Sequence, residues 1–238
     1  MPKWLIRLKG ERFDLEDFPK LLRLPEVKVV EEDGSFYLES SEFNSLTSAE
    51  EVRERGRELI KLINGVTKFN RNNFLGISED AIIRVEDDGK RHGYLFLESS
   101  VKIRTKTKCQ LTAIAADGSE IGITQPSALE SLFEVAQKHN VVAKALSLYQ
   151  HGTWNSLYKA YETLRGDVCG EYQIIKNGWS VKSDISRFRQ TVQSEAAIGD
   201  SARHVASNKF KPPAQPMTLL EARALIKTIL SRWVSSKT

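Results

Sequence analysis

Near residue 126 the spacing of apolar residues along the chain changes from alternation to a helical repeat. Before this point apolar and polar residues alternate in short runs, as where Ile6 and Leu8 alternate with Arg7 and Lys9. Alternation with a period of two is typical of β-strands with one buried face, whereas a recurrence every three or four residues is typical of amphipathic helices. The sequence therefore predicts an α+β protein, with strands first and helices second.

Three stretches of the N-terminal half are predicted to be β-hairpins. Each has an Asp-Gly pair at its centre, and both residue types tolerate the positive φ angles of a tight turn. The hairpins span 27–40, 82–100 and 111–124, with their turns at 33–34, 88–89 and 117–118. One helix interrupts them: Ser48 and Glu51 have the spacing of a capping box, and Gly65 is a suitable end. We expect this helix to pack on one face of an antiparallel sheet.

Helical repeats follow one another after residue 126. Two of them open with a capping box, in which Ser127 pairs with Glu130 and Thr218 with Glu221, and a shorter one is expected to be capped by Ser183. The Pro-rich stretch 211–217 is an extended lead-in to the last helix. We predict two domains: an α+β domain over residues 1–125 and a bundle of four to five helices over residues 126–238.

The composition excludes several classes of protein. Of the 238 residues, 40% are hydrophobic and 28% are charged, as in ordinary globular domains. No apolar run approaches the roughly 18 residues needed to span a bilayer, and the N-terminus has no signal-peptide core. Cys109 and Cys169 have no CxxC partners and no histidine at metal-ligand spacing. We expect a cytoplasmic protein with no metal, no cofactor and no membrane contact.

The positive charge of the chain is concentrated in its C-terminal half. Residues 1–125 carry 20 basic and 22 acidic side chains, whereas residues 126–238 carry 15 basic and 9 acidic ones. A local excess of positive charge favours polyanionic partners. The predicted partner is therefore nucleic acid, with RNA ahead of DNA, or an acidic protein.

One candidate binding surface is the stretch VKIRTKTKC at 101–109. It has a basic residue at every second position, so that on a strand all four would point to one face. These residues are Lys102, Arg104, Lys106 and Lys108. Such a ridge can follow a phosphate backbone. The alternative is an exposed strand whose lysines contact water or protect a sheet edge.

An aromatic set between residues 149 and 179 also allows two interpretations. Interleaved with basic residues, aromatic rings can stack on bases. At helical spacing with leucines, they form a buried stripe with tyrosine hydroxyls at its edge, and this is the interpretation we prefer. The set comprises Tyr149, Trp154, Tyr158, Tyr161 and Trp179.

The strongest site candidate is the basic segment 187–211. Its candidate nucleic-acid contacts are Arg187, Arg189, Lys209 and Lys211. Within it, GDSARH at 199–204 brings three catalytic candidates together: His204 as acid–base, Arg203 as phosphate clamp and Asp200 as the residue that orients them. The alternative is a structural loop in which Asp200 caps a helical turn, Arg203 bonds to it or to helix-end carbonyls, and His204 is a packing residue.

The C-terminal half resembles the HEPN superfamily of small all-helical domains. The resemblance covers roughly residues 126–238 and depends on the helix order together with RFRQ at 187–190 and ARH at 202–204. It implies a protein of host-defence or toxin systems, in which some members cut RNA and others only bind partners. Active members place an arginine four to six residues before the catalytic histidine. Here Arg203 directly precedes His204, and this departure leaves the non-catalytic branch open.

Three functions follow as hypotheses from the sequence. The first, which we prefer, is a protein that binds nucleic acid or an acidic partner through its basic helical half. The second is a metal-independent ribonuclease that uses Arg203 and His204. The third is a structural subunit of a protein complex.

Overall fold

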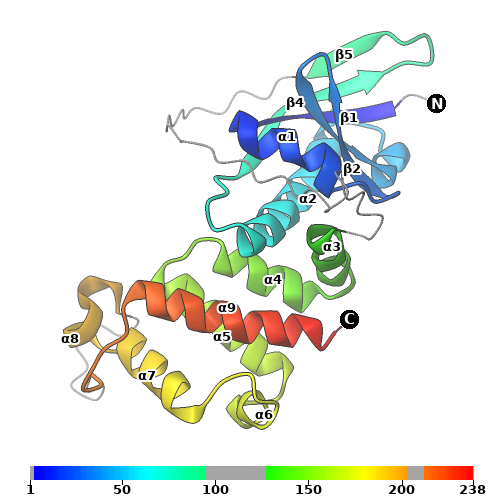
Figure 1. Ribbon diagram of the computed structural model, residues 1–238. Coiled ribbons are helices and arrows are strands. Elements are labelled where there is room, and N and C mark those ends of the chain that lie inside the picture. Colours follow the sequence, from blue (N-terminus) through cyan, green and yellow to red (C-terminus); the bar gives the residue numbers. More distant parts are fainter. Residues whose placement is uncertain (1–2, 95–126, 203–211, 238) are drawn as a thin grey trace, which may run out of the picture. The chain divides into compact units, whose positions relative to one another are not determined.

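The computed structural model describes residues 3–94, 127–202 and 212–237. It contains an N-terminal five-stranded sheet and a C-terminal part made of helices (Figure 1). The predicted α+β class is therefore confirmed. The predicted hairpin at 111–124 and the ridge at 101–109 lie outside the described residues, as do residues 95–100 at the end of the second hairpin.

The sheet has the strand order β2-β3-β1-β4-β5. Its strands are β1 (Lys3–Gly10), β2 (Val27–Glu32), β3 (Ser35–Ser40), β4 (Ile77–Val85) and β5 (Arg91–Tyr94). The predicted turn between β2 and β3 is confirmed, because Asp33 and Gly34 have φ angles of 50° and 71° and Glu32 pairs with Ser35. The pair β4–β5 closes through a longer turn, in which Gly89 has a φ of 82°, Asp88 has no positive φ, and Glu86 N donates to the carbonyl of Lys90 at 2.9 Å.

Strand β1 lies inside the sheet, between β3 and β4, and has buried residues on both of its faces. Trp4, Ile6 and Leu8 are buried as the alternation predicts, but Leu5 on the opposite face is only 1% exposed. The helices that accompany the sheet are α1 (Arg12–Leu21), the short 3-10 helix η1 (Ser41–Ser45) and α2 (Ala49–Asn70). Both α1 and η1 contact β1. Helix α1 is absent from the prediction, since it is short and contains Pro19, which usually ends a helix.

Helix α2 begins as predicted. Ser48 Oγ accepts a hydrogen bond from Glu51 N at 3.2 Å, and Glu51 Oε2 accepts one from Ser48 N at 3.2 Å. The predicted end at Gly65 is wrong, because the helix continues to Asn70. A Cβ atom at Gly65 would lie 3.2 Å from Ser147 N, in the backbone of the neighbouring helix α4 (Asn140–Tyr149). The glycine therefore permits a close approach of two helices and does not terminate one.

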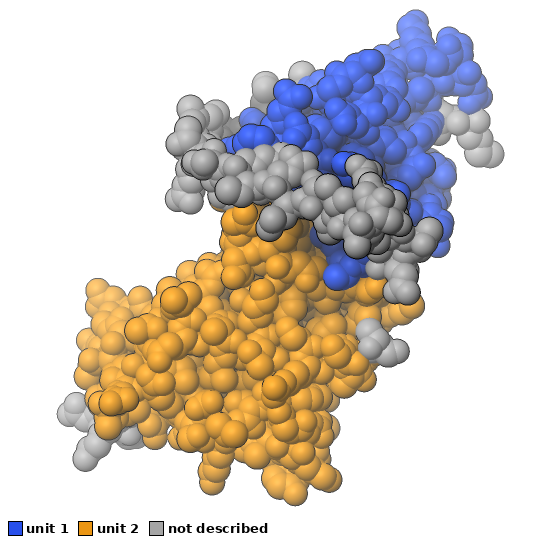
Figure 2. Space-filling view, in the orientation of Figure 1, with its two compact units in different colours: residues 1–56, 78–130 blue, residues 57–77, 131–238 orange. Residues whose placement is uncertain are grey.

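The chain divides into two compact units, residues 1–56 with 78–130 and residues 57–77 with 131–238 (Figure 2). One of the boundaries between the units falls within α2, after Gly56, and the others follow residues 77 and 130. The predicted domain limits, 1–125 and 126–238, meet outside the described residues and stay predictions.

The C-terminal helices follow most of the predicted repeats. Besides α4 they are α3 (Ala128–Lys138), α5 (Trp154–Asp167), α6 (Glu171–Lys176), α7 (Lys182–Gln193), α8 (Glu195–Ile198) and α9 (Leu219–Ser235). The capping boxes predicted for α3 and α9 are both present. The cap predicted for α7 is wrong: Val181 precedes the helix, and Ser183 lies in its first turn. The short α6 and α8 are absent from the prediction because six and four residues cannot display a helical repeat.

Helix α5 forms the centre of the helical part, since it contacts α4, α7 and α9 (Figure 1). Its Leu157 and Leu164 are fully buried. At the far end of the core the buried Trp233 donates from Nε1 to Asp167 Oδ2 at 2.9 Å, and Lys237 pairs with the same carboxylate at 2.9 Å. In the described part of the chain, no helix combines the length and the apolar character that a membrane crossing requires.

We expect Gly65→Val to destabilise the protein by about 1–3 kcal/mol, because the new side chain meets backbone atoms of α4 that cannot rotate away. The matched control is Gly166→Ala in α5, where a Cβ meets nothing within 4 Å. The control should stabilise by about 0.5–1 kcal/mol through helix propensity alone. Urea unfolding measures both variants, and a Gly65→Val variant as stable as the wild type would contradict the close approach.

Candidate functional site

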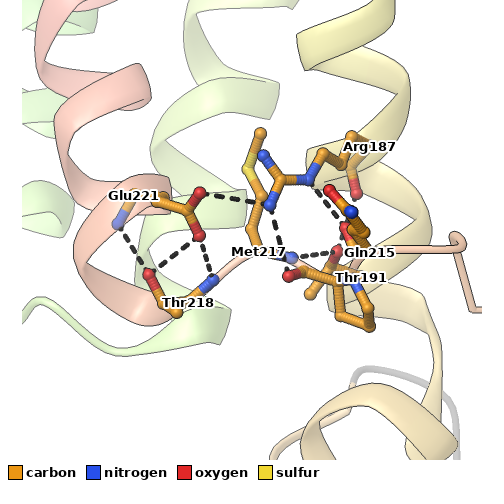
Figure 3. Close-up of polar contacts among 7 residues, drawn as sticks. Arg187, Thr191, Gln215, Met217, Thr218 and Glu221 are labelled. Carbon is orange, nitrogen blue, oxygen red and sulfur yellow. Dashed lines mark hydrogen bonds and ion pairs between the residues drawn. The ribbon is translucent and has the colours of Figure 1, made fainter.

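The predicted segment 187–211 begins on α7, and Arg187 is its first basic residue. The Arg187 side chain points toward the chain that leads into α9 (Figure 3). Its Nε donates to the carbonyl of Gln215 at 2.7 Å and its Nη2 to the carbonyl of Pro216 at 3.3 Å. Nη2 also pairs with Glu221 Oε1 at 3.1 Å. Arg187 therefore connects α7 to the lead-in and to the first turn of α9.

One turn further along α7, the Thr191 hydroxyl makes the second connection. It donates to the carbonyl of Arg187 at 2.8 Å and accepts from Met217 N at 3.0 Å. Thr191 is fully buried and Met217 is 6% exposed, so water cannot replace this bond. Residues 215–217 are thus fixed on α7 by two adjacent side chains (Figure 3). Thr191 escaped the prediction because its partner lies 26 residues later in the chain.

Glu221 joins this network to the start of α9. Its Oε2 accepts hydrogen bonds from Thr218 N at 2.7 Å and from Thr218 Oγ1 at 2.9 Å. The Thr218 backbone N–H, then its hydroxyl and the Arg187 guanidinium, lower the pKa of the Glu221 carboxyl from its ordinary value. The capping box predicted from sequence therefore also provides the carboxylate that holds Arg187.

Arg189, the second predicted contact on α7, is paired toward α6. Its Nη1 lies 2.9 Å from Glu171 Oε2, and the Tyr161 hydroxyl donates to the same oxygen at 2.9 Å. Burial, followed by the bond to Glu171, raises the pKa of Tyr161. Arg187 and Arg189 thus both have roles inside the protein, and their contact with nucleic acid stays a prediction.

The GDSARH group is only partly described. Asp200 is exposed, in the 3-10 helix η2 (Gly199–Ser201), which follows α7 through the short α8. The other candidates of this region, Arg203, His204, Lys209 and Lys211, lie outside the described residues, as do Lys102, Arg104, Lys106 and Lys108. The joint action of Asp200, Arg203 and His204 therefore stays a prediction. The structure describes the chain on either side of this segment: η2 comes before it, and residues 215–217, which α7 holds, come after it.

The aromatic set is largely buried, as the interpretation preferred from the sequence predicts. Tyr149, Tyr158 and Tyr161 are at most 3% exposed and Trp179 is 9% exposed, whereas Trp154 is half-buried. Tyr158 and Tyr161 pack around Phe188 of α7, with ring centroids 6.0 and 5.9 Å away. These rings form the core between α5 and α7 and leave no face for a base.

Neither a metal site nor a pocket in the sheet is a stronger candidate. Among the described residues, no group of three or more His, Cys, Asp or Glu side chains could hold a metal ion. The sheet part has an open cavity of about 460 Å³ lined by Lys3, Trp4, Lys28 and Glu39 among others. Both lysines pair with Glu39, at 2.7 and 3.3 Å, so that much of their charge is compensated. The basic excess of the helical part is the stronger candidate.

We expect Thr191→Val to cost about 1–3 kcal/mol, because it leaves the buried Met217 N–H without an acceptor. The matched control is Thr228→Val on α9. Thr228 makes the same bond to a carbonyl four residues earlier, at 3.0 Å, but is exposed and holds no other segment. Thermal unfolding compares the two variants, and equal losses of stability would contradict the proposed anchoring.

The Glu221 network predicts a defined pH dependence. Since the pKa of Glu221 is lower in the folded protein than the ordinary value of 4.5, its ionised form stabilises the fold above pH 4.5. This contribution is lost as the pH falls through the folded-state pKa. The difference in melting temperature between wild type and Glu221→Gln should be positive at neutral pH and shrink in acid. A difference that does not change with pH would rule the network out as its source.

Comparison with known proteins found no matching family model, no matching curated protein and no matching solved structure. The resemblance to the HEPN superfamily consequently stays a prediction from the residues quoted above. The function of the chain has to be inferred from its own charges, contacts and geometry.

Proposed function

We propose that this chain is a cytoplasmic nucleic-acid-binding protein, with RNA ahead of DNA, whose contact surface is the segment 203–211 of the helical part. The observation that carries the proposal is that the chain is anchored shortly after this segment. Residues 215–217 are hydrogen-bonded to Arg187 and Thr191 of α7. Binding residues are commonly found on loops that a rigid scaffold positions.

The composition of the segment supports this assignment. Residues 203–211 read RHVASNKFK, with three basic side chains, one histidine and no carboxylate. The half of the chain that contains it carries 15 basic and 9 acidic side chains. Such an excess raises the local concentration of a polyanion and steers it to the surface, with a strong dependence on salt.

Arg187 and the residues proposed to contact RNA have different roles in this proposal. Arg187 acts as a positioning residue, because three acceptors in the lead-in and in α9 occupy its N–H groups. The direct contacts proposed for RNA are Arg203, Lys209 and Lys211. Membership of a host-defence system, and ribonuclease activity with His204 as acid–base, depend on the sequence alone and are not part of this proposal.

The test replaces the three proposed contacts together, as Arg203→Gln, Lys209→Gln and Lys211→Gln. We expect the affinity for single-stranded RNA to fall by at least about tenfold, and the slope of log affinity against log salt to decrease by about 2, at about 0.7 per lost phosphate contact. Fluorescence anisotropy over a salt series measures both quantities.

The control removes the same charge elsewhere on the helices, as Lys138→Gln, Lys176→Gln and Lys182→Gln, three exposed lysines on α3, α6 and α7. It should retain most of the affinity. Equal losses in both triple variants, or a wild type that binds no polynucleotide, would overturn the proposal. Binding of polyglutamate in place of RNA would favour an acidic protein partner.

A further inference from the structure

Two aromatic rings from distant parts of the chain meet under two cations of α9. Phe69 at the end of α2 and Tyr149 at the end of α4 have ring centroids 5.4 Å apart, in an edge-to-face arrangement. Arg223 Cζ lies 5.9 Å from the Tyr149 centroid, and Lys227 Nζ lies 5.8 Å from the Phe69 centroid. Both rings are at most 5% exposed, whereas both cations are half-buried. Each cation thus rests on a ring and keeps one side toward solvent.

The position of Arg223 is specifically accommodated. Gly152, just after α4, has φ +64°, and a Cβ atom there would collide with the Arg223 guanidinium. Burial raises the pKa of the Tyr149 hydroxyl, and the positive charge of the nearby Arg223 partly lowers it again. The Tyr149 side chain and the turn at Gly152, which has no side chain, therefore define the position of this guanidinium.

These two cations lack the acidic partners that three other cations of the helical part have. Arg187, Arg189 and Lys237 each pair with a carboxylate. Among the described residues, no carboxylate forms an ion pair with Arg223 or Lys227. The two are four residues apart on one helix, where like charges repel each other. An anion bound to both would remove this repulsion.

We infer that Arg223 and Lys227 form a phosphate-binding site for the backbone of a polynucleotide. The Arg223 fork can donate two parallel hydrogen bonds to one phosphate, and Lys227 adds a point charge beside it. The rings beneath are buried and stack on no base, so this site contacts the backbone without reading sequence. The inference depends on the proposed function for its ligand and adds a contact outside the segment 187–211.

The test compares the wild type with the double variant Arg223→Gln and Lys227→Gln. We expect about tenfold weaker binding of single-stranded RNA, equally for different sequences, and a salt slope smaller by about 1.4 for two lost contacts. The single variant Lys227→Gln leaves the contacts of Arg223 with Tyr149 and Gly152 unchanged, and it should show about half of that change in slope. Circular dichroism checks that each variant is folded. The charge-matched control is Lys138→Gln with Lys182→Gln, which should bind as the wild type does.

A second arm measures the thermal shift produced by inorganic tripolyphosphate, which separates this inference from the proposed function. Stabilisation of the wild type that the double variant loses, without RNA binding, would support the site with free phosphate as its ligand and overturn the proposed function. RNA binding with unchanged affinity and slope in the double variant would overturn the inference and leave the proposed function standing. Absence of both kinds of binding would overturn both.

Discussion

The buried hydrogen bond between the Met217 amide and the Thr191 hydroxyl is the contact on which the proposed site depends. It brings the chain back onto α7 after a segment that begins beyond η2. An unsatisfied buried amide costs free energy comparable with a whole hydrogen bond, so the lead-in cannot leave α7 without a substantial penalty. Arg187 adds two further bonds to the same stretch, and the capping box of α9 follows at once.

Two groups of cations in the helical part have different partners. Arg187, Arg189 and Lys237 are paired with carboxylates and connect helices to one another. Arg223 and Lys227 rest on aromatic rings and pair with no carboxylate among the described residues. A residue of the first group contributes mainly to the fold. A residue of the second group keeps its charge available, and this is the property that contact with a phosphate requires.

Local chemistry made much of the fold predictable. The capping boxes at Ser48, Ser127 and Thr218 and the turn at Asp33 involve partners within four residues, so the sequence contains the whole interaction. The helix end predicted at Gly65 is wrong because the sequence does not distinguish a glycine that ends a helix from one that lets a second helix approach closely. Only the structure places the backbone of Ser147 beside Gly65. Helix α1 was missed because Pro19 argues against a helix there.

The site was less predictable, because its partners are far apart in the chain. The sequence predicts Arg187 as a nucleic-acid contact, and its acceptors inside the protein lie 28 to 34 residues away. Arg223 and Lys227 were not predicted at all. Their spacing of four on a helix was the available signal, but only the structure brings Phe69 and Tyr149 beneath them.

We propose that RNA is bound by residues 203–211, which precede the stretch 215–217 held on α7, and by Arg223 and Lys227 of α9. Hydrogen–deuterium exchange of the whole chain, with and without single-stranded RNA, tests this most directly because it reports on every segment at once. The predicted result is slower exchange in peptides that cover residues 203–211 and the first half of α9, with the β-sheet unchanged. Slower exchange confined to the sheet, or none in residues 203–211, would contradict the account.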